Sequence, residues 1–203
     1  MRLDLVVGPN GSGKSTFVRL TLAPCRPGVP FVNADLIAER RWPDDPEAHA
    51  YEAARIAAAT RTALVARGRP LIAETVFSHP SKLDLLREAT AADYYSAVHV
   101  LMVPEELAVA RVAARVAAGG HAVPEDKIRG RYQRLWPLVA DAIGWADTAT
   151  AYDNTTRDGP RPVAVWSHGF AVGDPAWPGW APAPLTLRWP PETAAGPGDR
   201  GRR

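Results

Sequence analysis

The sequence predicts an α/β fold of three layers, in which helices cover both faces of a doubly wound, mainly parallel sheet. Short apolar segments alternate along the chain with longer helical ones, which is the pattern of parallel strands joined by crossover helices. A glycine-rich turn joins the first strand to the first helix. With 203 residues, of which 46% are hydrophobic and 23% charged, the chain has the size and composition of a globular domain.

The elements of the first half follow from apolar runs and from the glycines and prolines that end them. An apolar run predicts a strand at residues 3–7, and the helix at residues 15–22 ends near Pro24. A second strand is followed by a helix that begins at residue 34 and that Pro43 interrupts. The second strand, an alanine-rich helix that stops at a glycine, and the third strand are expected at residues 30–33, 47–66 and 70–76.

The second half continues the alternation. Residues 79–92 predict a helix with one apolar side, and residues 95–103 predict a strand rich in β-branched and aromatic residues. A helix at residues 105–118 ends at two glycines, and Pro124 then occupies the first turn of the next helix. That helix and the last two strands are expected at residues 124–140, 149–154 and 162–166.

The predicted domain comprises residues 1–173, and residues 174–203 are expected to form an irregular tail rich in proline and tryptophan. Seven prolines, which disfavour helices and central strands, occur in this tail among Trp177, Trp180 and Trp189. The tryptophans could strap the tail onto the domain or present a surface to a partner, and we expect the strap.

Cysteine content and charge narrow the classes of function. The single cysteine, Cys25, excludes a disulfide framework and a cysteine-based zinc site. No run of eighteen apolar residues is present, so we expect no membrane partner and a cytoplasmic location. The net charge is −1 over residues 1–110, +4 over residues 111–134 and −1 over residues 135–203. This distribution indicates a local anion site and makes nucleic acid an unexpected partner.

A phosphate-binding pattern, G-x-x-x-x-G-K-[ST], occupies residues 8–15 between a predicted strand and a predicted helix. Its glycines let backbone amides and the helix N-terminus face an anion. In such a P-loop Lys14 would reach the β- and γ-phosphates and Ser15 would bind Mg²⁺. The residues predicted to hold ATP or GTP are Gly8, Pro9, Asn10, Gly11, Ser12, Gly13, Lys14, Ser15 and Thr16.

The rest of the sequence narrows the class of P-loop protein. Transporter-type ATPases carry an LSGGQ-like signature and GTPases carry an N-K-x-D motif, and neither is present. The class that remains is a compact kinase of small molecules. We expect Lys14 to lie in an exposed loop, so that its replacement removes transfer without unfolding the protein.

Polar residues follow three predicted strands at the edge of the sheet where ligands bind. Asp35 could accept the proton of an acceptor hydroxyl, or it could cap the helix that follows. Glu74 and Thr75 could contact the substrate, and Glu74 could bind Mg²⁺ through water or form a buried ion pair. Asp153 and Asn154 end the fifth strand.

The basic segment, residues 111–134, predicts a helical lid that carries arginines. Guanidinium groups on such a lid would neutralise charge on a transferred phosphoryl group, although each could instead be a solvated surface group. His121 lies in the hinge, where it could pack, cap a helix or contact the substrate. The arginines expected to face the site are Arg111, Arg115, Arg131 and Arg134.

Over about residues 1–166 the chain resembles the zeta-toxin family of P-loop kinases. The resemblance rests, in order, on GPNGSGKSTF, FVNADLIA, IAETVFSHPSKLDLLREA, RVAARVAAGGHAVPEDKIRGRYQRL and AYDN. The best-understood members use ATP or GTP with Mg²⁺ to phosphorylate the amino-sugar hydroxyl of UDP-N-acetylglucosamine, and the family is often paired with an antitoxin. The resemblance therefore implies a P-loop kinase fold and a sugar-nucleotide acceptor.

The resemblance also implies roles for individual residues. Lys14 and Ser15 match the triphosphate and metal residues, and Asp35 matches the aspartate that activates the acceptor hydroxyl. Glu74 and Thr75 match contacts to the substrate. The lid arginines match a phosphate-binding pair, whose members are Arg111 and either Arg115 or Arg131.

The predicted function is transfer of a γ-phosphoryl group to a hydroxyl of a sugar nucleotide, with toxicity and an antitoxin partner as hypotheses. His121 and Arg134 complete the predicted contacts to the substrate. One alternative is a kinase of nucleic-acid 5′-hydroxyls or of another nucleotide, which would favour a broader basic groove. Another is a non-enzymatic module that binds ATP as a switch.

Overall fold

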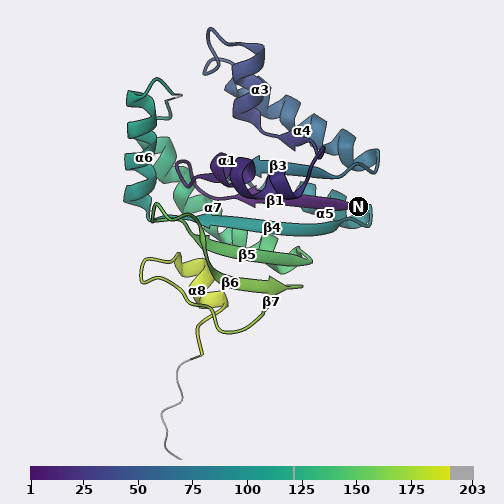
Figure 1. Cartoon of the computed structure of the whole chain (residues 1–203), viewed down its shortest axis with the longest axis vertical. Helices are drawn as coiled ribbons and strands as arrows, with labels where there is room; N and C mark the ends of the chain where they lie inside the picture. Colours follow the sequence, from purple (N-terminus) through teal and green to yellow (C-terminus); the bar gives the residue numbers. More distant parts are fainter. Residues whose placement is uncertain (121, 193–203) are drawn as a thin grey trace, which may run out of the picture.

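A seven-stranded sheet forms the centre of the computed structural model, which describes residues 1–120 and 122–192 (Figure 1). Its strand order is β2-β3-β1-β4-β5-β6-β7. The pairs from β2 to β5 are parallel, and β6 and β7 are antiparallel additions at one edge. The strands are β1 (Arg2–Val7), β2 (Phe31–Val32), β3 (Leu71–Thr75), β4 (Tyr95–Met102), β5 (Thr148–Asp153), β6 (Arg161–Ser167) and β7 (Phe170–Ala171).

Helices cover both faces of this sheet. They are α1 (Lys14–Phe17), the π-helical turn η1 (Val18–Leu22), α2 (Ala23–Cys25), α3 (Ala34–Arg41), α4 (Ala50–Ala66), the 3₁₀ turn η2 (Pro80–Lys82), α5 (Asp84–Ala91), α6 (Glu105–Ala117), α7 (Glu125–Trp145) and α8 (Ala183–Arg188). The strand order and the helices confirm the predicted three-layer, doubly wound, mainly parallel fold.

Alternate residues of β1 supply the two apolar cores. Leu5 and Val7 belong to a large core that includes side chains of α5, α7 and α8. Val6 faces the other way and packs with Phe17 and Val18 of the first helical segment. Successive strand residues point to opposite faces, so β1 is buried on both sides and its end is held firmly where the glycine-rich loop begins.

A buried ion cluster lies near the start of β1. Asp4 is 1% exposed, and its carboxylate accepts hydrogen bonds from Arg2, Arg26 and His99 at 2.9 to 3.2 Å. Burial alone would raise the pKa of Asp4, but the hydrogen bonds from His99 and Arg2 and the charge of Arg2 hold that pKa well below its usual range. The cluster ties β1 to the neighbouring β4 and to the segment that follows α2.

The first helical segment differs from the prediction of one helix ending near Pro24. It contains the π-helical turn η1 and continues through α2 to Cys25. Pro24 lies in the first turn of α2, where its missing N–H is tolerated. The helix predicted from residue 47 begins at Ala50, and the one predicted from residue 79 begins as the 3₁₀ turn η2 before α5.

Helix α7 extends to Trp145, beyond the predicted end near residue 140. It contains Pro137 in its interior, so the proline did not end it. Eight of its residues are buried, among them Leu135, Val139 and Ile143. Burial of this apolar stripe outweighs the hydrogen bond that Pro137 removes.

The expectation of an irregular tail from residue 174 is wrong for Ala183–Arg188, which forms α8. Leu185 of α8 is fully buried in the large core. Trp166 of β6 packs against Trp177 and Trp189, whose ring centroids lie 5.9 and 5.1 Å from its own. The described part of the tail is therefore packed on the domain, and residues 193–203 of the predicted tail lie outside the described residues.

No helix in the described ranges is long and apolar enough to cross a membrane.

Candidate active site

Three glycines shape the loop between β1 and α1. Gly8, Gly11 and Gly13 have φ values of 148°, 73° and 86°, which L side chains rarely adopt. A Cβ atom at Gly8 would collide with the Leu101 carbonyl oxygen, and one at Gly11 would lie 2.6 Å from the Ala108 oxygen. The loop therefore needs glycine both for its turn and for its close approach to β4 and α6.

Asn154 holds the loop from the end of β5. Its Nδ2 atom donates to the Ser12 carbonyl oxygen at 2.7 Å. The same atom lies 2.5 Å from where a Cβ of Gly13 would stand. The two predicted polar residues at this strand end therefore differ in role: Asn154 holds the loop, whereas Asp153 accepts hydrogen bonds from Thr155. Neither is among the residues that line the cleft described below.

Lys14 is buried rather than exposed, with 7% of its surface accessible, so the expectation of an exposed loop lysine is wrong. Its Nζ atom donates to the Pro9 carbonyl oxygen at 2.9 Å, within the loop. Burial lowers the pKa of Lys14, while the charges of Glu74 and Asp35 oppose that change. The ammonium group is thus drawn into the loop in a place where an anion would stabilise it.

Ser15, Glu74 and Asn33 form a hydrogen-bonded group on neighbouring elements. Ser15 Oγ donates to the Glu74 carboxylate, at 2.9 and 3.0 Å from its two oxygens. Asn33 Nδ2 donates to Glu74 Oε2 at 2.7 Å. Glu74, at the end of β3, is 8% exposed. Its carboxylate therefore loses most of its hydration, and the hydrogen bonds from Ser15 and Asn33 replace that water.

The alternative in which Asp35 caps a helix is wrong, because Asn33 is the N-cap of α3. Asn33 Oδ1 accepts a hydrogen bond from the Leu36 backbone N–H at 3.1 Å. Asp35 lies in the first turn of α3 and is exposed toward the cleft that it lines. Within the described ranges, no hydrogen bond or ion pair engages its carboxylate.

A cleft with a volume of about 590 Å³ lies at the carboxyl edge of the sheet. In Figure 1, α3 and α4 lie on one side of the loop before α1 and α6 lies on the other; α7 also contributes to the cleft, through Arg131. It brings together twelve of the predicted site residues: Asn10, Gly11, Gly13, Lys14, Ser15, Thr16, Asp35, Glu74, Thr75, Arg111, Arg115 and Arg131.

The remaining predicted residues lie elsewhere. Gly8, Pro9 and Ser12 belong to the loop but do not line the cleft. Arg134 is exposed on α7 and also lies outside the lining, so the structure does not bring this predicted substrate contact to the site. His121 lies outside the described residues.

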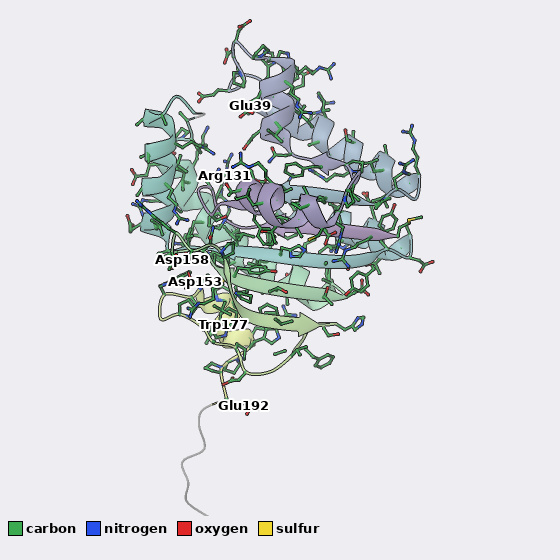
Figure 2. All side chains as sticks on the ribbon, in the orientation of Figure 1. Glu39, Arg131, Asp153, Asp158, Trp177 and Glu192 are labelled. Carbon is green, nitrogen blue, oxygen red and sulfur yellow. The ribbon has the colours of Figure 1, made fainter. Side chains whose placement is uncertain are left out.

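The lid arginines differ in how they are held. Arg111 donates to the carbonyl oxygens of Asn154 at 2.9 Å and Thr155 at 3.3 Å, which ties α6 to the end of β5. Arg131 is half-buried, and Figure 2 labels it beside the loop before α1, well away from Glu39 on α3. The charges of Arg115 and Arg131 both act to lower the pKa of Lys14, so three cations share one region.

Helices α6 and α7 are joined by ion pairs outside the cleft. Arg129 of α7 pairs with Glu105 and Glu106 of α6 and with Glu125 of its own helix. The Tyr132 hydroxyl donates to the Val103 carbonyl oxygen at 3.0 Å. Burial, reinforced by the charge of Glu105, raises the pKa of Tyr132 to about 12, so the hydroxyl stays a donor at neutral pH.

The oxygen atoms of Ser15 and Glu74 fit the requirements of a Mg²⁺ site. Ser15 Oγ and the Glu74 carboxylate lie side by side on the wall of the cleft. Within the described ranges, no group of three or more His, Cys, Asp or Glu residues could hold a metal ion. Mg²⁺ in phosphoryl-transfer sites takes one or two protein oxygens and completes its shell with phosphates and water, so this short donor set suits it.

Sequence reasoning missed three residues of the cleft, which are Asn33, Arg61 and Lys82. Asn33 is adjacent to residues that were singled out, but its hydrogen bond to Glu74 joins elements far apart in the chain. The spacing of Ala53, Ala57 and Val65, which places Arg61 on a buried stripe, was a signal that could have found it.

These features define a P-loop protein of kinase-like fold: a glycine-rich loop after β1, a carboxylate after β2, which lies two strands away, and an arginine-bearing helical pair over the same cleft. The chain belongs to the AAA domain family AAA_33, which it matches over residues 3–138. No curated protein matches it by sequence.

Solved structures share the fold at low sequence identity. A chain of the AvrRxo1-ORF1:ORF2 complex is 14% identical with a TM-score of 0.65, and the match covers 84% of this chain and 60% of that one. A further structure of that complex contains ATP, with a TM-score of 0.60. This chain thus spans 60% of the length of the AvrRxo1 chain that it matches.

Two other structures show the range of proteins with this fold. One comes from the PezAT toxin–antitoxin system of Streptococcus pneumoniae, with 14% identity, a TM-score of 0.60 and coverage of 83% of this chain and 74% of that one. The other is shikimate kinase from Acinetobacter baumannii in complex with shikimate, with 20% identity, a TM-score of 0.50 and coverage of 77% and 85%.

Proposed function

We propose that the protein is a kinase that transfers the γ-phosphoryl group of ATP or GTP to a hydroxyl group of a small-molecule acceptor. The observation that carries this proposal is that Lys14 of the P-loop and the carboxylate of Asp35, which no described residue engages, line the same cleft. A phosphate-binding cation and a proton acceptor that share one space are what phosphoryl transfer to an alcohol requires.

The proposed step is an in-line displacement at the γ-phosphorus. The acceptor oxygen forms a bond to that phosphorus while the bond from phosphorus to the β–γ bridging oxygen breaks. The proton of the acceptor hydroxyl passes to a carboxylate oxygen of Asp35, and the nucleoside diphosphate leaves with the electron pair of the broken bond. Asp35 suits this role because it does not cap α3 and, among the described residues, its carboxylate forms no ion pair.

Charge on the transferred group would be neutralised from two sides. Lys14 approaches from the loop, and Arg115 and Arg131 approach from helices α6 and α7. Charged groups held in fixed positions around the transferred phosphoryl group supply most of the catalysis in enzymes of this class. Arg111 would act at the same edge and also hold Asn154 in place. Ser15 and Glu74 are the residues that would hold Mg²⁺, which when bound neutralises the phosphate oxygens.

The comparisons support ATP as the phosphoryl donor and phosphoryl transfer as the class of reaction. A structure of the AvrRxo1 complex contains ATP, and a shikimate kinase has the same fold. The acceptor is proposed to be a sugar nucleotide such as UDP-N-acetylglucosamine, which the resemblance to zeta toxins supports. The excess of cations over carboxylates around the cleft also suits an acceptor that carries phosphate.

The test is transfer of label from γ-labelled ATP with Mg²⁺ to a panel of acceptors. The panel holds UDP-N-acetylglucosamine, free nucleosides, shikimate and a 5′-hydroxyl oligonucleotide, with the Lys14→Met variant as the negative control. Labelled sugar nucleotide supports the full proposal, and label on another small molecule replaces only the acceptor. Label on the oligonucleotide alone would favour the nucleic-acid kinase, and ATP binding without any transfer would favour a switch.

A toxic role is proposed on narrower grounds, namely the resemblance to zeta toxins and the likeness to a structure from a toxin–antitoxin system. Induced expression of the protein in a bacterial host should then arrest growth. The Asp35→Asn variant, expressed to the same level, should allow growth. Normal growth with the active protein would contradict the toxic role and leave the kinase proposal intact. An antitoxin partner would be recognised as a chain that restores growth by binding.

A further inference from the structure

Two cations lie on a wall that separates the cleft from a second cavity. This neighbouring cavity has a volume of about 240 Å³ and lies over α4, η2 and α5. Arg61 of α4, Lys82 of η2 and Thr75 of β3 line both spaces. Thr75 follows Glu74 at the end of β3, and both are the residues expected to contact the substrate, so the wall lies on the proposed acceptor side of the cleft.

Arg61 occupies a position that helix packing would give to an apolar residue. Ala53, Ala57, Arg61 and Val65 recur every four residues and are the buried residues of α4. Arg61 is 7% exposed. Arginine is almost never so deeply buried without a partner, because its charge loses its hydration.

No partner compensates Arg61 in the part of the chain that the structure describes. Its guanidinium makes no hydrogen bond there and no ion pair within 4.0 Å. Burial lowers the pKa of Arg61, and the charge of Glu88 opposes this from a distance. Glu88 itself accepts a hydrogen bond from Thr62 Oγ1 at 2.9 Å, and Asp84, the other carboxylate of this cavity, pairs with Arg87 at 2.8 Å.

Lys82 adds a second positive charge at the same place. Burial, and then the charge of Arg61, lowers the pKa of Lys82. Two like charges that repel each other in a partly dry cavity destabilise the free protein. An anion between them would relieve the repulsion and replace the lost hydration of Arg61.

We propose that Arg61 and Lys82 form an anion subsite that holds a phosphate or carboxylate group of the acceptor while its hydroxyl faces the P-loop. This inference rests on the proposed kinase function and narrows its substrate to acceptors with a fixed negative charge. The subsite is separate from the γ-phosphate region, since its residues lie on α4 and η2 and not on the loop or the lid. A neutral sugar or a free nucleoside would leave Arg61 unpaired and would bind poorly.

The test measures binding rather than turnover. The full-length protein is first saturated with a non-hydrolysable ATP analogue and Mg²⁺, so that the P-loop is occupied. Inorganic phosphate and malonate are then titrated by calorimetry. We expect one further anion to bind, and we expect Arg61→Leu to weaken that binding by about tenfold or more, which is what charge-assisted hydrogen bonds contribute.

The matched control is Arg55→Leu. Arg55 lies on the same helix but is exposed and lines neither cavity, so this variant should bind the anion as the wild type does. Arg61→Leu should have a urea midpoint equal to or above that of the wild type, because it removes an unpaired buried charge. A residue with a purely structural role would lower that midpoint and leave anion affinity unchanged.

A second variant, Lys82→Met, keeps the test decisive if Arg61→Leu fails to fold. The proposal is overturned if the nucleotide-loaded wild type binds no further anion, or if either variant binds it unchanged. Tighter binding of phosphate than of malonate assigns the subsite to a phosphate group, and the reverse order assigns it to a carboxylate. Anion binding without transfer to any acceptor would refute the kinase and not the subsite.

Discussion

Replacement of Asp4 by asparagine tests the ion cluster that anchors β1. The variant keeps the size of the side chain and removes its charge. Asp4 has 2% of its side chain exposed and accepts hydrogen bonds from Arg2, Arg26 and His99, whose side chains are 33%, 32% and 12% exposed. A hydrogen bond to a charged group contributes about 1.5–3 kcal/mol, and the partial exposure of both arginines places the combined loss at the lower end, about 2–3 kcal/mol.

Urea unfolding at neutral pH measures this loss. With a denaturant dependence of about 2–3 kcal/mol per molar urea, the midpoint should fall by roughly 1 M. The matched control is Asp141→Asn, because the Asp141–Arg188 pair is 50% and 44% exposed at 3.1 Å. That variant should lower the free energy of unfolding by less than about 1 kcal/mol. Equal effects of the two variants would refute the reasoning from burial.

The pH dependence follows from the lowered pKa of Asp4. A carboxylate whose folded pKa lies below its unfolded value of about 3.9 stabilises the fold fully above that value. The contribution is lost as the pH falls from about 4 toward the folded pKa. The difference in unfolding free energy between wild type and Asp4→Asn should therefore persist from neutral pH to about pH 4 and shrink below it. A difference that stays constant at pH 3 would contradict the account.

Three further predictions concern the site and the tail. Lys14→Met should lower transfer by about 10²–10³-fold, as loss of one electrostatic group does, while circular dichroism shows an intact fold; wild-type transfer would contradict its role. Arg131→Ala should cause a loss of the same order, whereas Arg134→Ala, which removes an arginine outside the cleft, should change the rate by less than about threefold. Trp189→Ala should lower the free energy of unfolding in urea by about 2 kcal/mol, because Trp189 packs on Trp166 and is only half-buried. Transfer should be unchanged, and a loss of activity without a loss of stability would place the tail at the site.

The sequence predicted the parts of the fold that depend on local pattern. The glycine-rich loop, the strands from β1 to β5 and the lid helices follow from residues close to one another in the chain. The end of α7 and the existence of α8 could not be predicted in this way. Pro137 is locally unfavourable inside α7, and α8 is only six residues long, so both depend on contacts with distant residues of the large core.

The site was predicted where a motif or a strand end marked it. Lys14 and Asp35 were found by position, but the burial of Lys14 and the hydrogen bond from Asn33 to Glu74 depend on contacts between segments far apart in the chain. Arg61 and Lys82 carry no motif. Their significance comes from the absence of a partner within the described residues, which no pattern of single residues conveys.

The most direct test of the proposed mechanism compares two carboxylates of α3. Asp35 lines the cleft, whereas Glu39, one turn further along, is exposed outside it (Figure 2). Single-turnover transfer from γ-labelled ATP to the acceptor identified by the panel is measured for Asp35→Asn and Glu39→Gln. The account predicts that Asp35→Asn transfers about 10²–10⁴-fold more slowly with unchanged ATP affinity, and that Glu39→Gln matches the wild type. Transfer by Asp35→Asn at the wild-type rate would contradict it.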